Sequence, residues 1–133
     1  MQTYQGSCHC KRVRFEADID LARTTTTRCN CTSCWKRRWW GVGVKPDCFR
    51  LLSGLDDLVK WRPAAGPGGF CRHCGVAVFA SVDAAEWNDG AYVSVNVPCL
   101  DGVEPATLAA IPIVYLDGLH DTWQPIAGET RYL

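Results

Sequence analysis

Apolar and polar residues alternate over short runs along most of the chain, a pattern typical of half-buried β-strands. The clearest run covers residues 13–17, Val-Arg-Phe-Glu-Ala. Proline, glycine and asparagine divide the chain into further short runs. These further predicted strands cover 24–28, 39–44, 49–53, 58–62, 76–82, 92–97 and 113–116. Many short strands separated by turn residues predict an all-β fold.

Two short segments are predicted to be helical. Residues 34–38 contain no helix breaker, and Thr32 or Ser33 can cap a helix that begins there. Such a helix would place Cys34 near its N-terminus, where the helix dipole favours a thiolate. Residues 105–110 indicate one further helical turn.

The length of 133 residues predicts a single domain, spanning 1–133, with a core of moderate size. The stretch 64–69, Ala-Ala-Gly-Pro-Gly-Gly, is predicted to be a surface loop. The first ten residues lack the basic and apolar segments of a signal peptide. No stretch approaches the roughly 18 apolar residues that cross a membrane. We therefore expect a cytoplasmic protein whose thiols are reduced and which has no membrane partner.

The nine cysteines dominate the candidate chemistry, because seven of them stand in three close groups. The groups are Cys8-x-Cys10, Cys29-x-Cys31-x-x-Cys34 and Cys71-x-x-Cys74. CxC and CxxC spacings allow two thiolates to bind one tetrahedral metal ion. An odd number of cysteines fits a disulfide framework poorly, and reduced thiols favour metal binding.

The two outer pairs together predict a closed zinc site with four cysteine ligands. Residues 70–75, Phe-Cys-Arg-His-Cys-Gly, have the form of a zinc knuckle, in which Gly75 can adopt positive φ. Closed four-ligand sites are structural. Because this site would join distant parts of the chain, folding would depend partly on zinc. A redox-active CxxC is the alternative interpretation of the third group.

The central group, Cys29, Cys31 and Cys34, predicts a zinc site with three protein ligands and one open position, as in catalytic zinc centres. Side chains alternate in an extended CxC, so His9 and Asn30 would point away from the flanking sulfurs. Neither is expected to be a ligand. Three alternatives remain open: a closed site, a redox-active trio and a vacant one. The fourth ligand of a closed site would be Cys48, Cys99, a histidine or an acid.

The formal net charge is zero, but the charges are distributed unevenly. Six basic residues and one acid lie between residues 28 and 50, around the central cysteine group. We expect a small anionic ligand there. Its carboxylates would be bound by Lys36, Arg37 and Arg38. Nucleic acid is not expected as a partner, because a neutral chain lacks the broad basic face that binds a long polyanion.

Aromatic residues accompany this basic run. Trp35, Trp39 and Trp40 are interpreted as a pocket wall for a small ligand, although aromatics among cations also occur in proteins that stack nucleic-acid bases. Cys99 follows a proline at the end of a predicted strand and is predicted to be buried, with a position near the open site as a further possibility. His120 is interpreted as a hydrogen-bonded residue, with an acid–base role as the alternative.

Three motifs follow one another in a distinctive order. They are Gly6-Ser7-Cys8-His9-Cys10 with Val13-Arg14-Phe15, Cys29-Asn30-Cys31-Thr32-Ser33-Cys34, and Gly69-Phe70-Cys71-Arg72-His73-Cys74-Gly75. Together with 95–97, 100–103 and Asp117-Gly118, they resemble the glutathione-dependent formaldehyde-activating enzyme family, also called the CENP-V/GFA domain. Asn30 stands where this family commonly has a histidine.

The resemblance implies an all-β fold of the Mss4-like (β-tent) type and two zinc ions per chain. It implies a structural zinc on Cys8, Cys10, Cys71 and Cys74, and a catalytic zinc on Cys29, Cys31 and Cys34. The implied activity is that of a carbon–sulfur lyase, similar to S-(hydroxymethyl)glutathione synthase, acting on glutathione and formaldehyde. The alternatives are a non-enzymatic zinc module that binds a protein or a small thiol, and a redox or metal sensor.

Overall fold

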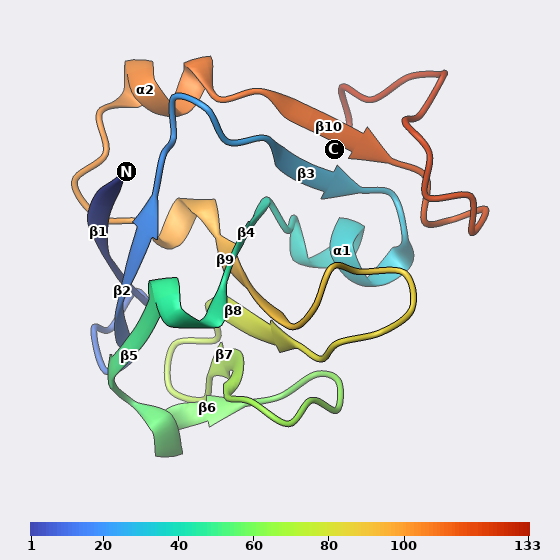
Figure 1. Ribbon diagram of the computed structural model, residues 1–133. Helices are drawn as coiled ribbons and strands as arrows, with labels where there is room; N and C mark the ends of the chain where they lie inside the picture. Colours follow the sequence, from blue (N-terminus) through green and yellow to red (C-terminus); the bar gives the residue numbers. More distant parts are fainter.

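The computed structural model describes residues 1–133, which form ten β-strands, two short α-helices and three 3₁₀ turns (Figure 1). The strands are β1 Gln2–Ser7, β2 Arg14–Ile19, β3 Thr26–Cys29, β4 Gly41–Val44, β5 Phe49–Ser53, β6 Leu58–Val59, β7 Gly68–Cys71, β8 Ala77–Val82, β9 Tyr92–Asn96 and β10 Ile113–Leu116. The helices are α1 Thr32–Arg37 and α2 Pro105–Ala110, and the 3₁₀ turns are Pro46–Cys48, Leu55–Asp57 and Val97–Cys99.

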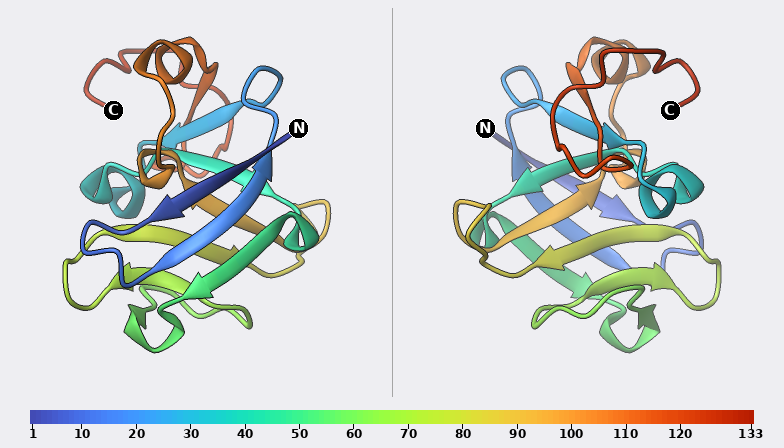
Figure 2. Two further views of the ribbon diagram at one scale, coloured as in Figure 1. Left: turned by 90° about the vertical axis from the view of Figure 1, so that its left-hand side faces the viewer. Right: turned by 90° about the vertical axis from the view of Figure 1, so that its right-hand side faces the viewer.

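The strands form two sheets that face each other (Figure 2). The smaller sheet has the order β1-β2-β5, and the larger has the order β10-β3-β4-β9-β8-β7-β6. Neighbouring strands are antiparallel except for β10 and β3, which are parallel. Parallel strands end at the same edge of a sheet, so the segments that follow β3 and β10 emerge next to each other. This edge carries the central cysteine group.

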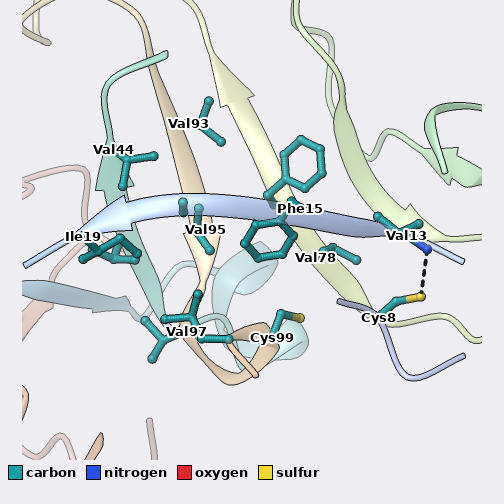
Figure 3. Close-up of a cluster of buried hydrophobic side chains, with 14 of the residues drawn as sticks. Cys8, Val13, Phe15, Ile19, Val44, Val78, Val93, Val95, Val97 and Cys99 are labelled. Atoms are coloured by element: carbon teal, nitrogen blue, oxygen red, sulfur yellow. Dashed lines mark hydrogen bonds between the residues drawn. The ribbon is translucent and has the colours of Figure 1, made fainter. Parts of the chain in front are cut away.

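The core lies between β2 of the smaller sheet and the middle strands of the larger one (Figure 3). Phe15 of β2 is fully buried, and its ring lies 5.3 Å from that of Phe49 and 6.0 Å from that of Phe79. Val95 of β9 is also fully buried. The core continues to the first cysteine group, because the backbone N–H of Val13 donates to the Cys8 sulfur at 3.4 Å. Burial of the core thus fixes one end of that group.

The predicted all-β fold class is confirmed, and the short strands organised around two cysteine clusters agree with the Mss4-like type. The strands predicted at 49–53 and 113–116 and the helical turn at 105–110 have the predicted bounds. The strand predicted at 58–62 is shorter, since only Leu58–Val59 pairs with β7. Neither helix has the length and the apolar character that crossing a membrane requires.

Two strands were absent from the prediction. β1 carries a polar sequence, Gln-Thr-Tyr-Gln-Gly-Ser, and pairs with β2 along its whole length. β7 includes Gly68 and Gly69, which the composition assigned to a surface loop. Gly69 has φ +125°, and a Cβ atom there would lie 1.9 Å from the carbonyl oxygen of Val59. The close approach of β6 therefore requires glycine, and the glycine pair belongs to a buried strand rather than a loop.

Candidate functional site

The two outer cysteine pairs meet in space. The sulfur atoms of Cys8, Cys10, Cys71 and Cys74 all lie within 4.8 Å of one another, and we call this set the four-cysteine cluster. The first pair lies in the turn after β1. In the second pair, Cys71 ends β7 and Cys74 lies in the turn that joins β7 to β8 (Figure 2). Cys8 and Cys71 are almost completely buried, at 1% and 0% exposure. The cluster therefore links the smaller sheet to the far end of the larger one.

Both turns have the backbone that a cysteine knuckle needs. Gly75 has φ +78° and donates its N–H to the carbonyl of Cys71 at 2.8 Å. Lys11 has φ +66° and donates to the carbonyl of Cys8 at 3.3 Å, so the first pair lies in a turn and not in the extended backbone assumed above. His9 lies outside the cluster, as predicted, although the reason is the turn rather than strand alternation.

The central group also assembles. The sulfurs of Cys29, Cys31 and Cys34 lie within 4.8 Å of one another, and we call this set the trio. Cys29 ends β3, Cys31 caps α1, and Cys34 lies in the first turn of that helix. The backbone N–H groups of Cys31 and Cys34 donate to the sulfurs of Cys29 and Cys31, each at 3.4 Å. The residue that caps α1 is therefore Cys31, and the prediction of Thr32 or Ser33 was wrong.

The thiols of the trio differ in acidity. Burial raises the pKa of Cys34 to about 12, and the neighbouring charge of Cys31 adds to this shift. Burial also raises the pKa of Cys29, and a backbone hydrogen bond from Cys31, which lowers it, only partly offsets this effect. For Cys31 burial is outweighed by hydrogen bonds from the Cys34 backbone and side chain, and its pKa is lowered. The helix cap thus favours the thiolate of Cys31, whereas the prediction assigned that effect to Cys34.

Both clusters have the donor set of a zinc site. Thiolate sulfur is a preferred zinc ligand, and Zn–S bonds of about 2.3 Å in a tetrahedron place the sulfurs about 3.8 Å apart. In the four-cysteine cluster, the Cys8–Cys10 and Cys10–Cys71 sulfur distances are each 3.6 Å. The sulfurs of both clusters therefore lie close enough together to bind one metal ion each.

No fourth protein ligand joins the trio. Cys48 packs against the hydrophobic core instead. Cys99 is buried beside Asn96, its sulfur lies 3.5 Å from the carbonyl oxygen of Ala77, and its pKa is raised to about 12 by burial and by the charge of Cys8. Cys99 therefore lies on the side of the four-cysteine cluster, and the possibility that it lies near the open site is wrong. The trio keeps one side free of protein ligands.

A loop that the sequence did not connect with the trio lies directly against it. Asn30 is buried, and its backbone N–H donates to the carbonyl of Leu116 at the end of β10. Its side chain donates to Asp117 Oδ1 at 3.0 Å and accepts from the backbone N–H of Leu119 at 2.9 Å. His120 Nδ1 lies 2.9 Å from the same carboxylate oxygen, as expected of a hydrogen-bonded histidine. Hydrogen bonds from Asn30 and His120 hold the pKa of Asp117 below its usual range.

This loop leaves no space above Cys29. A Cβ atom added to Gly118 would lie 2.6 Å from the Cys29 sulfur and 2.9 Å from the ring of Trp123. The backbone N–H of Gly118 also favours the Cys29 thiolate. Asn30 is thus a positioning residue, because it holds the 117–119 backbone against the trio. The signal for this contact in the sequence was the Asp117-Gly118 pair, which spacing alone could not connect with residue 29.

We expect Gly118→Ala to weaken metal binding at the trio by about 10–100-fold, the usual cost of disturbing the surroundings of a metal ligand. The added methyl group would push the Cys29 sulfur or Trp123 out of place. Competition with a chromophoric chelator measures the affinity. Gly128→Ala is the matched control, since a Cβ atom there meets nothing within 4 Å. Equal affinities for the two variants would contradict the expectation.

The basic residues predicted to bind a ligand differ in their contacts. The guanidinium of Arg37 lies 4.5 Å from the ring of Trp61 and donates to the Ser33 carbonyl at 3.3 Å. The Lys36 side chain makes no hydrogen bond or ion pair. Arg38 lies at a small hollow beside the trio and donates to the carbonyl of Tyr132. Of the three predicted residues, only Arg38 lines this hollow.

The hollow is bounded on one side by Cys29 and Cys34 of the trio. Its walls are Arg28, Cys29, Cys34, Trp35, Arg38 and Trp39, with Leu133 at its margin. Trp40 does not take part in it, because its Nε1 donates to Thr26 Oγ1 at 2.7 Å and its ring packs against the core. The prediction of a tryptophan wall therefore agrees with the placement of two of the three residues.

The order of the motifs and the geometry of the two clusters agree with a comparison against known families. A sequence model described as glutathione-dependent formaldehyde-activating enzyme matches residues 3–117. The chain belongs to this family. The matched segment contains both cysteine clusters and ends at Asp117.

One solved structure is similar to this chain over most of the length of both proteins. It is the crystal structure of a Rhodobacter sphaeroides protein, which is 27% identical to this chain and superposes with a TM-score of 0.64. The similarity covers 82% of this chain and 98% of that one. The two proteins therefore share their fold over nearly the whole length of the Rhodobacter protein.

Proposed function

We propose that the protein is a zinc-dependent carbon–sulfur lyase that joins a small thiol to an aldehyde, with glutathione and formaldehyde as the pair indicated by its family. The observation that carries the proposal is the trio: three thiols that converge without a fourth protein ligand, beside a hollow lined by cations and aromatics. In zinc enzymes, three protein ligands and a free position mark the catalytic sites.

The reaction balances without a further reactant. The thiol sulfur forms a bond to the aldehyde carbon, and the carbon–oxygen double bond becomes a single bond. The thiol proton ends on the resulting hydroxyl group, so the product is a hemithioacetal such as S-(hydroxymethyl)glutathione. No oxidant or reductant takes part, and the reverse reaction releases the aldehyde.

The proposal assigns different roles to the two clusters. Cys29, Cys31 and Cys34 would hold the catalytic zinc, and the four-cysteine cluster would hold the structural one. When bound at the trio, zinc lowers the pKa of a thiol that takes the free position, so that more nucleophile is present at neutral pH. Of Lys36, Arg37 and Arg38, which the sequence predicted to bind the ligand's carboxylates, only Arg38 lines the hollow and keeps this role. The cysteines of both clusters must be reduced to bind zinc, in keeping with the expected cytoplasmic location.

The test measures how fast the free thiol and its aldehyde adduct exchange at equilibrium. Exchange NMR on a mixture of glutathione and ¹³C-formaldehyde reports the interconversion of free and adduct forms. We expect the exchange rate to rise in proportion to protein concentration and to return to the uncatalysed rate when a chelator removes the metal. A rate equal to that of the protein-free mixture would overturn the proposal and favour a binding module.

A further inference from the structure

The hollow beside the trio holds two cations that no acid neutralises. Arg28 and Arg38 both line it, and neither takes part in an ion pair with a carboxylate. Arg28 stacks on Trp40, with 5.0 Å between its guanidinium carbon and the ring centroid. Two arginines that line one hollow without a counter-charge form a site for an anion, and a carboxylate is the group whose geometry guanidinium matches best.

Arg38 occupies a backbone position that costs stability. It ends α1 with φ +55° and ψ +40°, in the left-handed region, and its N–H bonds to the carbonyls of Cys34 and Trp35. Glycine is the residue that helix ends favour in this conformation, because residues with a Cβ atom are strained there. A strained arginine at a position where glycine would be more stable points to a function of its side chain.

The chain's own C-terminal segment now lies at this hollow. The Tyr132 ring meets Trp35 edge to face with 5.6 Å between centroids, and its carbonyl accepts a hydrogen bond from Arg38. Figure 2 shows the C-terminus on the same side of the molecule as α1. The space left is about 10 Å³, far below the roughly 300–1,000 Å³ of ordinary ligand pockets. A ligand the size of a tripeptide enters only if residues 130–133 move away.

We propose that Arg28 and Arg38 form the subsite for a carboxylate of the thiol substrate, and that residues 130–133 occupy this subsite in the free protein. The Tyr132 carbonyl takes the place of a substrate oxygen on Arg38. The substrate is thereby narrowed to thiols that carry a carboxylate several bonds from the sulfur. Segment 130–133 lies beyond the family match at 3–117. The inference rests on the proposed function only for the identity of the ligand as a thiol.

The test measures binding without the reaction. S-methylglutathione keeps both carboxylates but has no thiol to react, so its dissociation constant reports binding without the reaction, and the comparison among variants isolates the subsite. Calorimetric titration is carried out on the metal-loaded protein and three variants: Arg38→Gly, Arg37→Gln and a chain that lacks residues 130–133. We expect Arg38→Gly to weaken binding at least about tenfold, the loss expected for one charge-assisted hydrogen bond. Its melting temperature should equal or exceed that of the unmodified protein, because glycine relieves the strain.

The other variants decide between explanations. Arg37→Gln removes an equal charge one residue away, from a side chain that stacks on Trp61, and binding should stay within about twofold. Removal of residues 130–133 should tighten binding severalfold, and the diethyl ester of S-methylglutathione should bind no variant tightly. Equal losses in Arg37→Gln and Arg38→Gly would overturn the subsite, and weaker binding after truncation would overturn the cover. Exchange NMR on the same samples reports separately whether the proposed reaction occurs.

Discussion

Replacement of Cys71 by serine is expected to prevent the protein from folding. Cys71 has no exposed surface, and its sulfur lies 3.6 Å from that of Cys10, which is 61 residues away in the chain. Structural zinc contributes about 10–16 kcal/mol to the folding of small zinc domains. Whole domains are stable by only about 5–15 kcal/mol. Loss of one ligand of the four-cysteine cluster therefore removes an amount comparable to the entire stability.

The matched control is Cys48→Ser, which makes the same chemical change at a half-buried cysteine outside both clusters. Circular dichroism and thermal unfolding compare the two variants. We expect a cooperative transition for Cys48→Ser, with a melting temperature a few degrees below that of the unmodified protein. For Cys71→Ser we expect no native signal. If both variants melt at the same temperature, the four-cysteine cluster does not carry the fold.

The second large effect is expected for Cys31→Ser, which should abolish catalysis while the fold persists. Cys31 is the N-cap of α1, where its sulfur accepts the N–H of Cys34. Serine is among the best N-cap residues, so the helix should keep its cap. The trio, however, loses one of its three sulfurs. Since changes around a metal ligand already cost 10–100-fold, we expect the exchange rate above background to fall by at least about 100-fold.

Exchange NMR and a melting curve on the same Cys31→Ser sample separate these effects. The melting temperature should stay within a few degrees of that of the Cys48→Ser control, because the four-cysteine cluster remains intact. Full exchange activity in Cys31→Ser would remove the trio from the mechanism. Global unfolding of this variant would instead mean that the trio is a structural site.

The division of seven cysteines into a cluster of four and a trio could be predicted because it depends on local geometry. A CxC or CxxC spacing fixes how far apart two sulfurs lie, whatever the rest of the chain does. The start of α1 was less predictable. Capping rules describe oxygen acceptors, and in this protein the acceptor is the sulfur of Cys31, which moves the start of the helix to Thr32.

The contacts that complete the site depend on pairing over long range. Parallel pairing of β10 with β3 places Leu116 opposite Cys29, and this pairing brings Asp117 and Gly118 to the trio. Nothing in the spacing of these residues indicates which strand is the neighbour of β10. Polar β1 was missed for the same reason, since its strand is defined by pairing with β2 rather than by its own alternation.

The directions of neighbouring side chains also required the structure. Arg37 and Arg38 are adjacent in sequence and were assigned the same role. Successive residues on a helix point about 100° apart, and the left-handed backbone of Arg38 increases the difference. Arg37 therefore stacks on Trp61 while Arg38 lines the hollow. Arg28, which belongs to β3, was counted only as part of the basic run.

The trio is proposed to bind zinc with a position left for the substrate thiol. The most direct test is zinc X-ray absorption on protein that carries two zinc ions per chain, before and after addition of glutathione. One site with four sulfurs and one with three predict about 3.5 sulfur atoms per zinc on average, rising to about 4 with the thiol. A value of about 4 without the thiol, or one that glutathione leaves unchanged, would contradict the claim.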